Sequence, residues 1–343
     1  MRKLLNTLFV TTQGSYLSKD GETILVRVEN ETRLQVPVHT IGGIVCLGNI
    51  MCSPPLMALC AEHGVLLSFL SENGRFLARV QGSVSGNVLL RREQYRRADD
   101  EGKSAVIAQA VVVAKIANCR VVLLRCAREH PELAASAPLE KAADELYRLM
   151  DGIRDDLPLD TVRGVEGDAA RQYFSAFDNM IAAQKKDFMF VGRSRRPPLD
   201  NVNALLSFVY TLLVHDITSA LETVGLDPCV GFLHRDRPGR PSLALDMMEE
   251  FRPFLGDRLV LSLINRQQVQ GSGFQKTESG GVLMDEATRK EVILAYQKRK
   301  TEEIQHPFLC EKVQIGLLPF IQALLLSRFL RGDLDGYPPF FWR

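Results

Sequence analysis

One short stretch of the chain brings together acidic, basic and imidazole side chains. His234 is followed by a basic turn at residues 235–241. Three acidic residues then come within five positions: Asp246, Glu249 and Glu250. Carboxylates and imidazoles bind divalent metal ions, and guanidinium groups bind phosphate oxygens. This stretch is therefore a candidate site for a divalent metal that acts on a phosphate ester.

The spacing of the three acids limits how they can act. If residues 243–251 form a helix, Asp246 shares a face with Glu249 and with Glu250, while the two glutamates diverge from each other. Two acids could therefore meet one ion, but the spacing leaves open which glutamate is the partner. Acids on a solvated helix face would show the same spacing, so a purely structural role also stays open.

Length and composition indicate an ordinary globular protein with two domains. The chain has 343 residues, which exceeds the usual size of a single hydrophobic core. Basic residues number 42 and acidic residues 41, so a nucleic-acid partner must be inferred from local patches rather than from net charge. Seven cysteines lack the close pairing of zinc knuckles, so we expect reduced, buried thiols.

Two apolar segments could be mistaken for membrane or export signals. Residues 1–10 begin with basic residues, but their apolar run is short and interrupted, so we expect a first strand there. Residues 315–330 contain Pro319, Gln322 and Arg328 and are too short to span a bilayer. We therefore expect a cytoplasmic protein that does not insert into a membrane.

The hydrophobic pattern changes near residue 85. We predict an α+β fold, in which a small, mostly β domain at residues 1–84 precedes a larger all-α domain at residues 85–343. The expected strands are residues 4–11, 23–28, 33–37, 65–70 and 76–80, with hairpin turns at 19–21 and 72–74 and one helix between Ser53 and Gly64. The expected helices are residues 91–97, 104–128, 139–153, 160–177, 202–223, 243–251, 259–267, 285–300 and 313–329. Residues 271–281 are rich in Gly, Ser and Thr and are expected to form a mobile or ligand-facing loop.

A further carboxylate lies on an unusual helix face. Glu166 precedes Ala169, Ala170 and Tyr173 by three, four and seven positions, so it shares a face of mostly small residues that another helix could approach closely. A place near a helix N-terminus, where a negative charge is favoured, would also explain this residue.

Four segments resemble the CRISPR-associated spacer-acquisition integrase family and follow the order seen in it. They read EGDAARQYF from residue 166, NALLSFVY from 203, GFLH from 231 and LDMMEEFRP from 245. The resemblance covers essentially the whole chain, including residues 280–296 and the order of the β-rich and helical parts. The length and the sequence Phe251-Arg252-Pro253 resemble the subtype I-C branch of this family.

This resemblance implies a homodimeric, metal-dependent DNA endonuclease and integrase that inserts short foreign DNA fragments into a repeat array. Its ligands for Mg²⁺ or Mn²⁺ would be Glu166, His234 and Glu249, with Asp246 as the neighbouring acid. Many members of the family have Asp where this chain has Glu249. The resemblance also implies double-stranded and branched DNA substrates, a β domain for dimerisation or partner contacts, and a small CRISPR-associated adaptation partner that bridges two dimers.

The chemistry of the residues agrees with a hard metal ion. Carboxylate oxygens from Glu166 and Glu249, with Asp246 as a further metal ligand, suit Mg²⁺ or Mn²⁺, whereas a single imidazole is too few for a dedicated zinc site. His234 could be a ligand or a general acid or base, and the sequence does not separate these roles.

Two basic loops are the best candidates for contacts to DNA phosphates. Residues 290–300 are also basic but contain Glu291, so they resemble a solvated helix face, and Tyr210 is expected to be a core residue whose hydroxyl reaches the site. The predicted DNA-binding residues are Lys185, Lys186, Arg193, Arg195, Arg196, Arg235, Arg237 and Arg240.

Two other functions stay open at this point. The same site could hydrolyse branched DNA with water as the nucleophile. Alternatively, the basic loops could hold DNA for another catalyst, and the chain would then be a non-catalytic DNA-binding scaffold.

Overall fold

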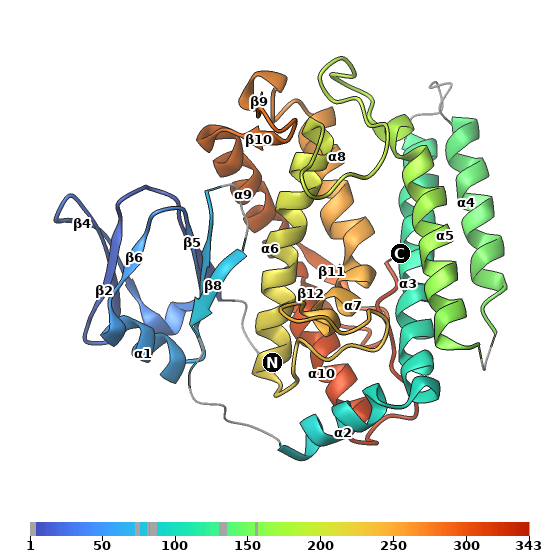
Figure 1. Ribbon diagram of the computed structural model, residues 1–343, viewed down its shortest axis with the longest axis horizontal. Helices are drawn as coiled ribbons and strands as arrows, with labels where there is room; N and C mark the ends of the chain where they lie inside the picture. Colours follow the sequence, from blue (N-terminus) through green and yellow to red (C-terminus); the bar gives the residue numbers. More distant parts are fainter. Residues whose placement is uncertain are drawn as a thin grey trace. The chain divides into compact units, whose positions relative to one another are not determined.

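The structure is a computed structural model that describes residues 5–72, 76–80, 82, 88–129, 136–154 and 157–342 (Figure 1). The chain divides into two compact units, Met1–Gly86 and Asn87–Arg343. The first unit is built mainly from strands and the second mainly from helices. The predicted α+β fold class is therefore confirmed.

Two four-stranded sheets and one helix form the first unit. Its core is a cluster of buried aliphatic side chains and cysteines. One sheet has the order β1 (Asn6–Val10), β5 (Ile41–Leu47), β7 (Leu66–Leu70) and β8 (Phe76–Val80), with its first three strands parallel. The other has the order β4 (Glu31–Pro37), β3 (Thr23–Val28), β2 (Tyr16–Asp20) and β6 (Met51–Cys52). Helix α1 (Pro54–Glu62) begins where expected, because the Ser53 hydroxyl accepts a hydrogen bond from the Leu56 N–H.

The strand prediction missed β2, β6 and β5, and β5 lies in the middle of the first sheet. Its sequence, IGGIVCL, is almost entirely buried and shows no alternation of apolar and polar residues. Strands in parallel sheets are buried on both faces, so such a run lacks the period-two signal of a half-exposed strand. The hairpin predicted at 72–74 falls partly on residues outside the described part of the chain, and the domain boundary predicted near residue 85 lies outside it as well.

The second unit is a bundle of helices around one long central helix. Helix α3 packs against α4, α5 and α7, so these three helices surround it (Figure 1). All nine helices expected in this region are present, with ends that shift by a few residues. They are α2 (Val88–Ala98), α3 (Glu101–Glu129), α4 (Ser136–Asp151), α5 (Leu159–Ala176), α6 (Asn201–Thr223), α7 (Ser242–Phe251), α8 (Arg258–Asn265), α9 (Glu286–Thr301) and α10 (Leu318–Leu330).

Two short hairpins modify the predicted all-α domain. The loop expected at 271–281 contains β9 (Phe274–Lys276), which pairs with β10 (Val282–Met284). The last helix begins at Leu318 rather than 313, because β12 (Lys312–Gln314) pairs with β11 (Glu303–Gln305). Pro319 then occupies the first turn of α10, where its missing N–H leaves no hydrogen bond unmade.

Helices α3 and α6 are long and apolar enough to cross a membrane by length and composition alone. In each, however, most of the apolar segment is buried inside the protein, 61% in α3 and 67% in α6. This burial is typical of the central helices of a folded core.

Candidate metal centre

Three helices bring two acidic side chains to one buried lysine. Lys115 of α3 forms ion pairs with Glu166 of α5 and with Glu249 of α7, where the Nζ–Oε2 distance is 2.7 Å. The Lys115 side chain is 5% exposed and the Glu249 side chain 1%, whereas Glu166 is 24% exposed. Two of the four acids singled out in the sequence therefore share one cation, and the Glu166 side of the cluster is open to solvent.

Glu249 is held as a carboxylate by cations on both of its oxygens. Arg252 Nη1 lies 3.0 Å from Oε1, and His234 Nε2 lies 4.0 Å from the same oxygen. Burial opposes ionisation, yet Arg252 and Lys115 together keep the pKa of Glu249 well below its usual range. Glu249 Oε2 is paired with Lys115 and has no further hydrogen-bond partner among the described residues.

Asp246 orients His234. Its Oδ1 lies 2.7 Å from His234 Nδ1 and accepts the His234 N–H, and its Oδ2 accepts the N–H groups of Phe232 and Leu233 at 2.6 and 3.0 Å. A carboxylate accepts hydrogen bonds and cannot donate, so His234 Nδ1 carries a proton toward Asp246, and Nε2 is the ring nitrogen that faces Glu249. Both oxygens of Asp246 already accept hydrogen bonds from the backbone and from His234, which argues against the predicted role of Asp246 as a metal ligand.

The loop before His234 approaches α7 too closely for a side chain at Gly231. A Cβ there would lie 2.7 Å from Asp246 Oδ2 and 2.8 Å from the Ser242 carbonyl carbon. On the other side, Arg163 of α5 donates from Nε to the Leu233 carbonyl at 2.7 Å. The loop is thus held between the helices that carry Glu166 and Glu249.

The Asp246→Asn substitution is expected to weaken Mn²⁺ binding about 10- to 100-fold, the usual effect of losing the partner that orients a histidine ligand. Asp246 now accepts hydrogen bonds from backbone N–H groups. The amide nitrogen of an asparagine would turn a donor toward one of these N–H groups, and that hydrogen bond would be lost. Isothermal titration with Mn²⁺ measures the effect. Asp236→Asn, a change at an exposed acid of the same loop, is the matched control, and equal affinities for the two variants would contradict this role.

Glu249 and Glu250 diverge, as their spacing predicts, and the structure shows which one faces the cluster. Glu250 points the other way, toward the C-terminal segment. It accepts hydrogen bonds from the Tyr337 hydroxyl at 2.6 Å, the Phe340 N–H at 2.8 Å and Gln322 Nε2 at 3.0 Å. These hydrogen bonds connect α7 to the C-terminal segment, so Glu250 has a structural role.

The buried Glu250 gives a testable pH dependence, because burial raises its pKa to about 7. The unfolded chain loses this proton near pH 4.5, so the folded state binds more protons between these values and stability falls as pH rises through them. The expected loss from pH 4.5 to pH 8 is roughly 3 kcal/mol. Glu250→Gln should remove this part of the pH dependence. Urea unfolding at pH 5 and pH 8 checks it, and identical pH profiles for both proteins would refute it.

The predicted DNA-binding residues fall into two groups. Arg195, Arg196 and Arg237 are exposed, and the charges of all three affect the pKa of the same residue, Arg240. Burial lowers the pKa of Arg240, and Arg237, Arg195 and Arg196 lower it further. The two basic loops predicted from separate parts of the sequence therefore lie near each other.

The remaining basic residues are engaged to different degrees. Lys186 is exposed, while Lys185 pairs with Asp178 and Arg235 pairs with Asp160. Arg193 departs from its predicted role most clearly. Its guanidinium donates to Asn203 Oδ1 and Ser207 Oγ and lies over the Tyr210 ring, so it braces the loop against α6.

Tyr210 is a core residue, as expected, and is 7% exposed. Its hydroxyl donates to Asp257 and does not reach Glu166 or Glu249, and the Arg252 guanidinium lies 4.8 Å from its ring centroid. Tyr210 therefore supports the arginine that pairs with Glu249.

Within the described residues, no three His, Cys, Asp or Glu side chains lie at metal-binding spacing. In the proposed site, the carboxylates form ion pairs with basic side chains instead: Glu166 with Lys115, and Glu249 with Lys115 and Arg252. The donor set nevertheless fits a hard divalent ion, with two carboxylates around a shared cation and an imidazole nitrogen beside one of them. Sequence reasoning missed Lys115, although a lysine in the apolar run VVVAKIANC is a signal of a buried charge.

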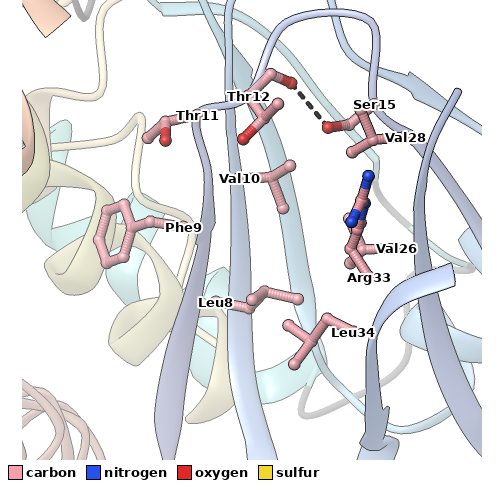
Figure 2. A pocket seen from close by; sticks show the side chains of 10 residues that line it. All are labelled: Leu8, Phe9, Val10, Thr11, Thr12, Ser15, Val26, Val28, Arg33 and Leu34. Atoms are coloured by element: carbon pink, nitrogen blue, oxygen red, sulfur yellow. Dashed lines mark hydrogen bonds between the residues drawn. The ribbon is translucent and has the colours of Figure 1, made fainter. Parts of the chain in front are cut away.

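A pocket of about 450 Å³ lies elsewhere, in the first unit. Figure 2 shows the side chains of Leu8 of β1 and Leu34 of β4 facing each other, and the Ser15 hydroxyl donating to the Thr12 carbonyl. The lining is aliphatic and hydroxyl-bearing, with one cation, Arg33, and offers neither a carboxylate nor an imidazole for metal chemistry.

Comparisons with known proteins agree on one family. The model of the family described as CRISPR associated protein Cas1 matches residues 8–298. CRISPR-associated endonuclease Cas1 1 of Chlorobaculum tepidum is 55% identical over 343 residues, which is 100% of both chains. Two solved structures share the fold: a casposase bound to integration product (TM-score 0.82, 22% identity, 97% of this chain and 93% of that one), and a Cas6-RT-Cas1–Cas2 complex (TM-score 0.83, 21% identity, 100% and 36%).

Proposed function

The chain belongs to the Cas1 family of CRISPR-associated proteins, and we propose that it is a metal-dependent DNA endonuclease and integrase. In this proposal it inserts short foreign DNA fragments into a CRISPR repeat array, through attack of a fragment's 3′-hydroxyl on a phosphodiester. The endonuclease name of a relative 55% identical over its full length supports the nuclease activity, and the fold shared with a casposase bound to integration product supports integration.

The observation that carries this proposal is the convergence of Glu166 and Glu249 on one cation, with His234 beside Glu249. These three side chains come from two helices and a loop that are far apart in the sequence. In the proposed site, Glu166, Glu249 and His234 Nε2 hold Mg²⁺ or Mn²⁺, which supplies Lewis-acid stabilisation of the charge that develops on the phosphate.

The other side chains prepare this site. Asp246 fixes the ring proton of His234 on Nδ1 and so presents Nε2, and Arg252 keeps Glu249 ionised. The surface of Arg195, Arg196, Arg237 and Arg240 binds the phosphates of the DNA, which brings the scissile bond to the carboxylates. Lys185, Lys186 and Arg235 extend this surface once their surface ion pairs exchange for phosphates.

The proposed assembly is a homodimer joined to a small CRISPR-associated partner that bridges two dimers, with the β unit making dimer or partner contacts. The Cas6-RT-Cas1–Cas2 complex that shares this fold supports such a partner. We also propose a cytoplasmic location and membership of the subtype I-C branch. The branch proposal rests on chain length and on the sequence Phe251-Arg252-Pro253.

A strand-transfer assay tests the activity. The purified protein receives Mn²⁺, a repeat-containing duplex, and a short DNA fragment with either a free 3′-hydroxyl or a 3′-deoxy end. Joined product is expected from the first fragment and absent with the second, because the attacking oxygen is missing. A His234→Ala variant should lose the joined product while remaining folded, and full activity of that variant would contradict the proposal.

The same assay separates the alternative functions. Cleavage of branched DNA without joining would indicate a hydrolytic nuclease. A protein that binds the duplex but neither joins nor cleaves it, and whose carboxylate variants behave as wild type, would be a scaffold.

A further inference from the structure

Lys115 is an unusual residue for the middle of a helical core. It lies in α3 between buried residues, including Val111, Val112 and Cys119, and is itself 4% exposed. A buried ammonium is strongly disfavoured unless negative charges compensate it. Its partners are Glu166 from α5 and Glu249 from α7, two residues that no other described side chain links directly.

A second buried lysine shows what an ordinary structural ion pair looks like in this protein. Lys300 of α9 is 5% exposed, and its Nζ lies 2.7 Å from Asp216 Oδ2, which also accepts the Tyr296 hydroxyl. Lys300 has one carboxylate partner. Lys115 instead bridges two carboxylates, and both belong to the proposed metal site.

We propose that Lys115 is a positioning residue that serves as a built-in cation in the metal-free protein and competes with Mg²⁺ or Mn²⁺ for Glu166 and Glu249. This inference rests on the proposed function, because it concerns the same two carboxylates. Without metal, the ammonium keeps the two acids side by side and relieves their mutual repulsion. When metal binds, the ammonium has to leave at least one of the two carboxylates.

This loss of an ion pair weakens metal binding. The interaction between charges at ion-pair distance is large inside a protein, where the dielectric constant is low. The neutral replacement Lys115→Met should therefore bind metal more tightly than the wild type, although its metal-free fold is less stable. A residue that merely supports the ligands would act in the opposite direction, since its loss would weaken metal binding.

The test is isothermal titration of the full-length protein with Mn²⁺ alone, combined with melting curves in EDTA and in saturating Mn²⁺. The Lys115→Met variant is expected to bind Mn²⁺ at least tenfold more tightly than wild type, to melt lower in EDTA and to gain more stability from Mn²⁺. Lys115→Gln keeps polar contacts without charge and should show the same gain in affinity. Lys300→Met is the matched control, which should lose stability but keep wild-type Mn²⁺ affinity.

Equal or weaker Mn²⁺ affinity in both Lys115 variants would overturn the competition. If neither variant folds, the wild-type structure with Mn²⁺ decides. Lys115 Nζ must then have left Glu166 or Glu249, and an unchanged pair of contacts overturns the proposal.

A further variant separates this inference from the proposed function. If Glu166→Gln leaves Mn²⁺ affinity unchanged, the proposed metal site itself is wrong. If Glu166→Gln weakens Mn²⁺ binding while the Lys115 variants match wild type, the metal site stands and only the competition fails.

Discussion

The Glu166→Gln substitution is expected to reduce strand transfer by about 10³-fold while the protein stays folded. The glutamine has the size and shape of the glutamate but provides only a neutral oxygen, so it binds a hard divalent cation far more weakly. The Glu166 side chain is 24% exposed, so its change should perturb the fold little. Joined product per unit time, measured at saturating DNA with Mn²⁺, gives the effect.

The control for this prediction lies on the same helix. Asp168 of α5 has an exposed side chain that pairs with Arg171, and Asp168→Asn should leave strand transfer within about twofold of wild type. A Glu166→Gln variant that keeps more than a tenth of wild-type activity would remove Glu166 from the metal site.

The Glu249→Gln substitution is expected to lower the free energy of unfolding by about 3–5 kcal/mol as well as abolish strand transfer. Glu249 is the carboxylate that Arg252 and Lys115 share, and all three side chains are less than a tenth exposed. Removing its charge leaves two buried cations, and Glu166 is then the only described carboxylate paired with either of them. Urea unfolding near neutral pH measures the loss.

A double variant identifies the cause of this destabilisation. Adding Lys115→Met to Glu249→Gln removes one of the two buried cations that lost the Glu249 charge and should restore part of the lost stability. Glu93→Gln breaks a partly exposed ion pair with Arg97 and is expected to change stability by less than about 1 kcal/mol. If Glu249→Gln matched Glu93→Gln, the cluster would contribute little to the fold.

The two glutamate predictions separate chemistry from stability. Glu166→Gln should affect activity without a large change in unfolding, whereas Glu249→Gln should affect both. The difference follows from the burial of the two side chains, since both are proposed to bind the same ion.

Local pattern predicted most of the helical elements because each has strong periodicity and clear ends. The helix at residues 243–251 shows what such a pattern can predict and what it cannot. Its spacing predicted that Glu249 and Glu250 diverge, but their roles depend on which segment packs on each side. The C-terminal segment that binds Glu250 comes from almost 90 residues further along the chain, and no local signal placed it there.

The site was less predictable than the helices for a similar reason. Asp246 could be placed on the same face as Glu249, but its contacts with the N–H groups of residues 232–234 depend on how a glycine-containing loop folds back onto α7. Lys115 is 51 residues away from Glu166, so their ion pair is a property of the bundle rather than of either sequence segment. The strand β5 was missed because a fully buried strand has no alternation.

The most direct test of the central claim is the position of Mn²⁺ in crystals of the protein, located by its anomalous scattering. The account predicts an anomalous peak within coordination distance of Glu166, His234 Nε2 and Glu249, with Asp246 still hydrogen-bonded to His234 Nδ1. Mn²⁺ bound elsewhere, or bound by Asp246 in place of His234, would contradict it.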